Sequence, residues 1–187
     1  MLHSELPLGP TRALRLADLP AGSRVHEMEF YLPAPRLEPA RLQRRLQAAG
    51  YPVPALSAHA LQGYLRGFID MVFEHEGRYY VLDWKSNHLG ESPSGYRRDR
   101  LAAVMAREGY HLQALLYLVA LHRHLALRLP GYDAAQHLGG ALYLFVRGVR
   151  PDWRDAEGRP AGVYLDRPGA ALIEDLSRLL DAEGGPA

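Results

Sequence analysis

The stretch GYLRGFIDMVFEHEGRYYVLDWKSN, residues 63–87, predicts a β-hairpin at the centre of the fold. Its two strands, 67–73 and 79–85, are rich in aromatic and β-branched residues, which favour extended structure. The dipeptide Glu76-Gly77 predicts a two-residue turn between them, because glycine readily adopts the positive φ that such a turn requires. Apolar residues on both faces of each strand indicate central strands that are covered on both sides.

The turn sets the register of this hairpin. If His75 pairs with Arg78, Asp70 lies directly opposite Asp83. Opposed residues share a face with Cβ atoms about 4.5–5.5 Å apart, and Lys85 points to the same face because strand side chains alternate. The other residues of this face are apolar: Phe68, Val72, Tyr79 and Val81.

Two facing carboxylates in an apolar setting need a compensating charge. At about 5 Å they repel each other by roughly 3 kcal/mol at an effective dielectric constant near 20, and desolvation adds to that cost. A divalent cation removes the repulsion, and Mg²⁺ prefers carboxylates, water and phosphate oxygens as ligands. The alternative that stays open is an Asp–Lys–Asp charge cluster on a sheet face, without a metal.

Length and composition indicate one soluble domain. The 187 residues are enough for a full core, and 48% apolar and 23% charged residues are ordinary for a globular protein. The net charge of +1 means that any nucleic-acid surface must come from local clustering. The chain has no cysteine, which fits a reducing cytoplasm. It shows no signal-peptide pattern and no apolar run long enough for a membrane helix.

Around the hairpin we expect a single α/β domain over residues 23–183, preceded by an irregular N-terminal arm over residues 1–22, where Pro and Gly are scattered. A first strand is expected at 25–32, ended by Pro33 and Pro35. Helices are expected at 36–49, 96–108, 110–129 and 169–182, and further strands at 139–146 and 163–165. The polar loop 86–95 leaves the carboxylate site directly, so it either touches substrate or is a plain connector.

The helix expected at 110–129 carries a polar and aromatic stripe. Tyr110, Gln113 and Tyr117 fall at i, i+3 and i+7 and therefore lie on one face. Such a stripe on an apolar helix indicates a rim or an interface. The nine histidines show no complete zinc ligand set, so a zinc site is not expected.

The acids and the lysine also match a known signature. Asp70 on one strand, followed by Asp83-Trp84-Lys85 on the next, resembles the PD-(D/E)xK nuclease motif without its proline. The surrounding sequence resembles the C-terminal nuclease domain of exodeoxyribonuclease V β subunits, from about residue 25 to about residue 180. The segments that carry this resemblance are GFIDMVFEHEGRYYVLDWKSNHLGE (67–91), GYHLQALLYLVALHRHL (109–125) and GGALYLFVRGV (139–149).

The resemblance implies a restriction-endonuclease-like fold, in which a central mixed β-sheet is flanked by α-helices, and Mg²⁺-dependent hydrolysis of DNA phosphodiester bonds. Asp70 and Asp83 would then hold one or two Mg²⁺ ions, helped by the backbone carbonyl of Trp84. Lys85 would orient the attacking water or offset charge on the phosphate.

Three further residues match positions of the family. Gln113 and Tyr117 correspond to its Q-x-x-x-Y element and would contact the DNA backbone close to the metal. Glu27, on the first strand, corresponds to an acidic position and is a candidate metal ligand, with a solvated surface residue as the equal alternative.

The chain departs from the family in two respects. A histidine metal ligand on an upstream helix has no counterpart here, since His3 matches nothing at that position. No Walker-type Gly-x-x-x-x-Gly-Lys-Ser/Thr motif occurs, so no ATP-driven motor is expected in this chain. We therefore expect a fragment of a longer helicase–nuclease subunit or a truncated product.

The expected setting is DNA end processing in recombinational repair, in a bacterial cytoplasm and associated with the nucleoid, without a membrane. The expected partners are DNA, other helicase–nuclease subunits and a strand-exchange recombinase. The alternative function is a non-catalytic module that binds DNA or the recombinase.

Overall fold

A five-stranded mixed sheet forms the centre of the fold, in the order β3-β4-β5-β6-β7. The computed structural model describes residues 3–8, 13–34, 37–55, 63–155 and 157–181. The strands are β3 (Arg24–Ala34), β4 (Gly63–His75), β5 (Arg78–Lys85), β6 (Leu138–Phe145) and β7 (Val163–Asp166). Neighbouring strands are antiparallel except β5 and β6, which are parallel. With its flanking helices, this sheet confirms the predicted α/β class.

The central hairpin has the predicted register. Its ladder runs from His75 paired with Arg78 to Met71 paired with Leu82. Glu76 and Gly77 both have positive φ, 53° and 76°, as in the type I′ turn that suits a two-residue hairpin loop. The ladder ends at Met71, so Asp70 and Asp83 come directly after the last pair of residues.

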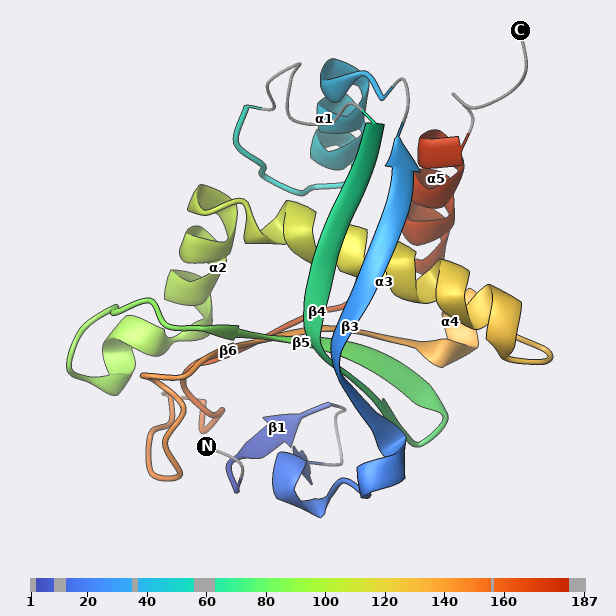
Figure 1. Cartoon of the computed structure of the whole chain (residues 1–187). Coiled ribbons are helices and arrows are strands. Elements are labelled where there is room, and N and C mark those ends of the chain that lie inside the picture. Colours follow the sequence, from blue (N-terminus) through green and yellow to red (C-terminus); the bar gives the residue numbers. More distant parts are fainter. Residues whose placement is uncertain (1–2, 9–12, 35–36, 56–62, 156, 182–187) are drawn as a thin grey trace, which may run out of the picture.

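Helices cover one side of the sheet, with α3 lying across it (Figure 1). The helices are α1 (Pro39–Ala48), α2 (Arg98–Arg107), α3 (Tyr110–Arg128), α4 (Ala134–His137) and α5 (Ala170–Asp181). The chain passes through α2, α3 and α4 between β5 and β6, since a parallel pair requires a long crossover. The main core is formed where α3 packs on the sheet. Among the described residues, no helix is long and apolar enough to span a membrane.

The opposite face of the sheet is covered by the N-terminal residues, and the expectation of an irregular arm there is wrong. β1 (Glu5–Pro7) pairs antiparallel with β2 (Ala13–Arg15), and two 3₁₀ turns follow at 16–18 and 21–23. The leucines of this segment are buried against the hairpin face formed by Met71, Phe73, Tyr80 and Leu82, because burial removes these apolar side chains from water. The leucines are Leu6, Leu8, Leu14, Leu16 and Leu19.

β3 continues past Pro33, where the sequence predicts its end. It is an edge strand that pairs with β4 alone, the kind of strand in which proline is tolerated. Residues 28–34 and 63–69 form a two-stranded ribbon, here called the β3–β4 ribbon, that rises from the sheet in front of α3 (Figure 1). Its inner face packs into the main core, whereas its outer face is exposed.

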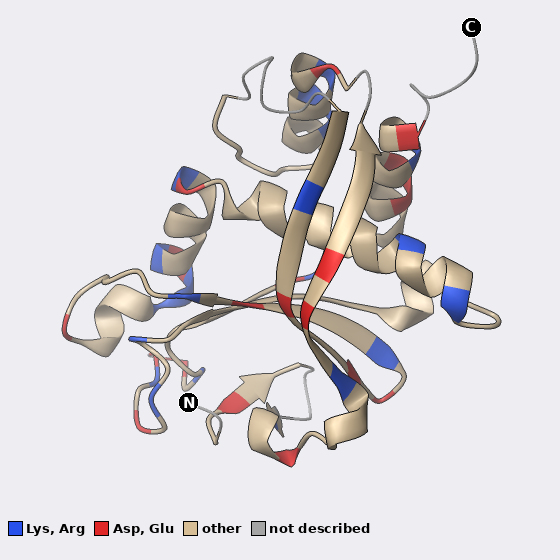
Figure 2. Ribbon diagram, viewed as in Figure 1, with Lys and Arg blue, Asp and Glu red and all other residues tan. Residues whose placement is uncertain are grey.

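The remaining predicted elements are present, with ends shifted by at most three residues. The sequence did not predict α4, and the loop 86–95 ends in a 3₁₀ helix at Pro93–Tyr96. Residues 56–62, between α1 and β4, lie outside the described residues. Basic residues lie on α1, α2, β4 and α3 with acidic residues between them, in keeping with the small net charge (Figure 2).

Candidate active site

Asp83 lies near the carboxyl end of β5 and is only 4% exposed. Its Oδ2 atom is 2.7 Å from Nζ of Lys85. This is an ion pair without the alignment of a hydrogen bond, so Oδ2 has no hydrogen-bond partner among the described residues. Burial raises the pKa of Asp83, and the neighbouring lysine opposes that rise without cancelling it. The site therefore contains a buried carboxylate oxygen with unused lone pairs.

Asp70 faces the same gap from β4. Its Oδ2 accepts a 2.9 Å hydrogen bond from the backbone N–H of Trp84. Asp70 and Asp83 are neighbours of the last ladder pair, Met71 and Leu82, so the two carboxylates lie close together. The charge of Asp70 adds to the rise in the pKa of Asp83. The N–H and C=O of an extended residue point to the same side, so the Trp84 carbonyl faces this gap as well.

Lys85 joins this acidic pair to the helix above it. Its Nζ donates a 2.8 Å hydrogen bond to Oε1 of Gln113 and lies 4.0 Å from the ring centroid of Tyr110. Tyr143 on β6 donates to the same Oε1 at 3.1 Å, and Nε2 of Gln113 donates to the hydroxyl of Tyr117 at 2.9 Å. The predicted stripe of α3 thus packs over the strand residues of the site.

The two tyrosines of this network are kept protonated by their surroundings. Burial, reinforced by the charge of Asp83, raises the pKa of Tyr117 and Tyr143 above the ordinary tyrosine value. The neutral Tyr143 hydroxyl donates to Oε1 of Gln113, while the Tyr117 hydroxyl accepts from Nε2 of Gln113, so the two tyrosines fix the amide from both ends. The resulting site combines two acids, one lysine and neutral donors in a largely apolar wall.

Glu27 is not brought into this group. It has φ of 52° and interrupts the β3–β4 ladder between the pairs His26–Met71 and Met28–Ile69, at the position opposite Asp70. Its side chain is exposed. Within the described ranges, no three His, Asp or Glu side chains come together as a metal-binding cluster. The structure therefore assembles Asp70, Asp83, Lys85, Gln113 and Tyr117, and leaves Glu27 at the rim.

The donors of the site fit a hard divalent cation. Asp83 contributes the buried Oδ2 that lacks a hydrogen-bond partner in the described part of the chain, and Asp70 engages one of its two oxygens with Trp84. Carboxylate and backbone carbonyl oxygens are the ligands that Mg²⁺ accepts, usually alongside water. A cation here would also offset the burial cost that raises the pKa of Asp83.

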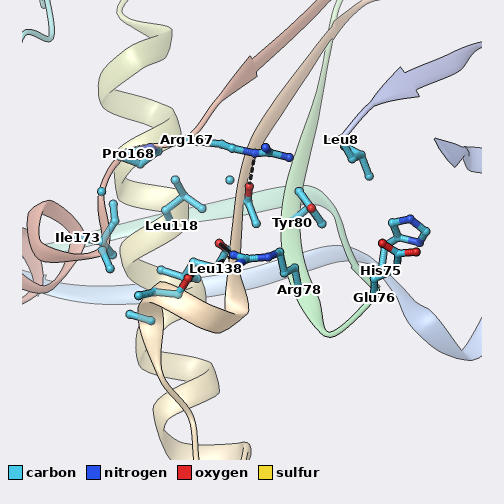
Figure 3. A pocket seen from close by; sticks show the side chains of 16 residues that line it. Leu8, His75, Glu76, Arg78, Tyr80, Leu118, Leu138, Arg167, Pro168 and Ile173 are labelled. Carbon is cyan, nitrogen blue, oxygen red and sulfur yellow. Dashed lines mark hydrogen bonds between the residues drawn. The ribbon is translucent and has the colours of Figure 1, made fainter. Parts of the chain in front are cut away.

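A pocket of about 560 Å³ lies elsewhere, at the opposite ends of β5 and β6 (Figure 3). Arg78 and Arg167 line it, and both side chains donate hydrogen bonds to backbone carbonyls within residues 135–139. The carboxylates and the lysine lie at the carboxyl ends of these strands, so the pocket is separate from the candidate site.

Sequence reasoning missed Tyr143 and the contact of Tyr110 with Lys85. Tyr143 is fully buried and stands beside Asp83 in the parallel pairing of β5 with β6. The two strands are separated by more than fifty residues, and no turn sets their register as it does in the hairpin. The available signal was the polar hydroxyl within the apolar run GGALYLFV, since a buried tyrosine usually needs a hydrogen-bond partner.

Comparison with known proteins agrees with this geometry. The model of the PD-(D/E)XK nuclease superfamily matches residues 11–183. The RecBCD enzyme subunit RecB of Escherichia coli K12 is 44% identical over 175 residues, which are 90% of this chain and 14% of that protein. RecB of Haemophilus influenzae is 38% identical over 92% of this chain and 14% of its own length. RecB of Mycobacterium tuberculosis H37Rv is 39% identical over 95% of this chain and 18% of its own length.

The chain thus spans about one seventh of the length of the first two of these relatives. The match to the superfamily, in contrast, covers the whole sheet and the helices that pack on it. Both the fold and the sequence lead to one assignment: this chain belongs to the PD-(D/E)XK nuclease superfamily.

Proposed function

We propose that this chain is a Mg²⁺-dependent deoxyribonuclease domain of the exodeoxyribonuclease V β type, which hydrolyses phosphodiester bonds during DNA end processing. The observation that carries the proposal is the buried Oδ2 of Asp83, which has an ion pair with Lys85 but no hydrogen-bond partner in the described residues. Nucleases of this superfamily generally use divalent metal ions. Lys85 offsets only one of the two negative charges of Asp70 and Asp83, and a divalent cation would offset the remainder.

In this proposal, Asp70, Asp83 and the carbonyl of Trp84 hold the cation. When bound, it supplies Lewis acidity that polarises the phosphate and activates water. Lys85 is held by Gln113 and Asp83, so its charge is positioned to offset the negative charge that develops on the phosphate. Water adds to phosphorus, the bond to one sugar oxygen breaks, and that oxygen takes up a proton.

Three residues have supporting roles. Gln113 fixes Lys85 through Oε1 and Tyr117 through Nε2, and we propose that both α3 residues contact the DNA backbone where it enters the site. Glu27 is exposed beside Asp70 in sequence register, which suits a position for a water-mediated role at the rim.

The proposed setting follows from the named relatives, which are subunits of the RecBCD enzyme. We propose that the domain works with other helicase–nuclease subunits on DNA, in the bacterial cytoplasm at the nucleoid. Contact with a strand-exchange recombinase is a further proposed partnership. We also propose that the chain is a piece of a longer subunit whose remaining part would supply the motor and a histidine ligand.

Cleavage of end-labelled DNA tests the proposal. The parent chain is expected to degrade DNA with Mg²⁺ or Mn²⁺ and to stop when EDTA is added. Asp83→Asn is expected to lower the rate at least about 100-fold, because the cation loses its buried ligand. Asp152→Asn, which changes an exposed turn residue, is the matched control and should cleave like the parent. Equal, metal-independent cleavage by parent and Asp83→Asn would refute the proposal.

A further inference from the structure

The outer face of the β3–β4 ribbon carries large aromatic side chains that are exposed to solvent. Tyr64 is 74% exposed, Tyr31 55% and Phe68 49%. The sequence predicts that Phe68 is covered like the other apolar residues of its strand face, and the structure contradicts this. Isolated exposed aromatics are common, but a contiguous group on one strand face indicates an interaction surface.

Arg66 organises these rings. Its guanidinium carbon lies 5.4 Å from the ring centroid of Tyr31 and 5.7 Å from that of Phe68. Oε1 of Glu29 accepts hydrogen bonds from Nε of Arg66 at 2.7 Å and from the hydroxyl of Tyr31 at 2.8 Å. Exposed ion pairs of this kind add little to stability. The array is better explained as a preorganised surface, since fixing side chains in advance lowers the cost of binding.

The exposed side chains of β4 on this face lie in line with the candidate active site. Tyr64, Arg66 and Phe68 alternate with inward residues along β4, and Asp70 is the next position of that alternation. At about 3.3 Å per residue, Phe68 lies about 7 Å and Tyr64 about 20 Å from Asp70 along the strand. A flexible ligand that follows the ribbon would therefore reach the carboxylates end-on.

Single-stranded nucleic acid fits such a surface. Its bases expose apolar faces that stack on aromatic rings and on arginine, whatever the sequence. In a duplex those faces are already stacked on each other and are not available. The phosphates of the strand would then run towards Asp70, Asp83 and Lys85.

We propose that Tyr31, Tyr64, Arg66 and Phe68 on the outer face of the β3–β4 ribbon stack the bases of a single strand and guide it to Asp70. The proposal rests on the proposed nuclease function, because the direction of the strand is defined by the site at its end. It adds a binding surface that the motif residues do not include.

Fluorescence anisotropy in EDTA tests the surface without cleavage. The probes are a labelled oligothymidylate of about 12 nucleotides, an abasic strand of the same length and a blunt duplex. The parent is expected to bind oligothymidylate about tenfold more tightly than the abasic strand. The double variant Tyr64→Ala/Phe68→Ala should lose that difference, whereas Tyr64→Phe, which keeps the ring, should retain it. Leu127→Ala, an 84% exposed residue near the end of α3, is the matched control.

Equal binding of oligothymidylate and the abasic strand by the parent would overturn the proposal, and that comparison needs no variant to fold. Unchanged binding by the double variant would overturn it as well, because the rings of Tyr64 and Phe68 would then not contribute to binding the strand. Asp83→Asn separates the two proposals. If it binds strands normally but no longer cleaves, both stand; if it still cleaves like the parent, only the proposed function fails.

Discussion

The backbone N–H of Trp84 donates a 2.9 Å hydrogen bond to Oδ2 of Asp70, beyond the last ladder pair of the central hairpin. Beyond the Met71–Leu82 pair, the N–H of Trp84 thus bonds to a side chain of β4 and not to a backbone carbonyl of that strand. This bond holds Asp70 close to Asp83 beyond the end of the ladder. The arrangement of the candidate site depends on this departure from regular pairing.

Lys85 is the only lysine in the chain, so its ammonium group can be tested cleanly. We expect Lys85→Met to lower DNA cleavage about 100-fold or more, because the positioned cation beside the phosphate is lost. Lys85→Arg should restore only part of the rate, since a planar guanidinium does not reproduce the ammonium geometry towards Gln113 and Asp83. Steady-state cleavage rates measure both effects. Full activity of Lys85→Met would exclude the assigned role.

Tyr143 is expected to act on the site through Gln113. Tyr143→Phe removes the hydroxyl that donates to Oε1 at 3.1 Å, and should cost about 1 kcal/mol of unfolding free energy. The cleavage rate should fall as well, because Gln113 then holds Lys85 less firmly. Tyr79→Phe is the control, since the Tyr79 hydroxyl makes no hydrogen bond within the described part of the chain. Loss of stability with an unchanged rate would limit Tyr143 to packing.

The hairpin turn gives a prediction about the fold alone. Gly77 has φ of 76°, and Gly77→Ala places a Cβ in a conformation that costs about 1 kcal/mol. Denaturant unfolding should show this loss, while Gly22→Ala, at a position with open space and ordinary φ, should change stability little. If the two variants unfold alike, the turn is not the type I′ turn described.

The sequence predicts those features of the structure that depend on local chemistry. The hairpin register, and with it the meeting of Asp70 and Asp83, follows from local chemistry, because a two-residue turn fixes every pair that follows. The stripe of Gln113 and Tyr117 follows from helical periodicity in the same way. Both features depend on residues close together in the chain.

The missed features depend on distant parts of the chain. The leucines around Leu6 and Leu16 pack on the hairpin face of Met71 and Leu82, a contact between distant segments that local patterns do not reveal. The exposure of Phe68 results from the β3–β4 ribbon leaving the sheet, which strand alternation does not reveal. Tyr143 reaches Gln113 through a parallel pairing of two strands between which the chain forms α2, α3 and α4.

The raised pKa of Asp83 predicts how cation binding depends on pH. Burial favours the neutral carboxyl, so the contribution of Asp83 to metal-free stability is full below the ordinary aspartate pKa and is lost as pH rises through the raised value. A cation binds the ionised form. The increase in Tm caused by Mg²⁺ should therefore be absent at acidic pH and grow as pH rises through the pKa of Asp83. At a hundredfold excess over Kd it corresponds to about 2.7 kcal/mol. A Tm increase that is independent of pH would place the cation elsewhere.

Calorimetric titration of the metal-free chain with Mn²⁺ tests the central claim most directly, because it needs neither DNA nor cleavage. We predict that the parent and the exposed-residue control Asp152→Asn bind the ion alike, and that Asp70→Asn and Asp83→Asn each weaken binding at least about tenfold. Undiminished binding by both variants would contradict the assignment of these two carboxylates as the metal ligands.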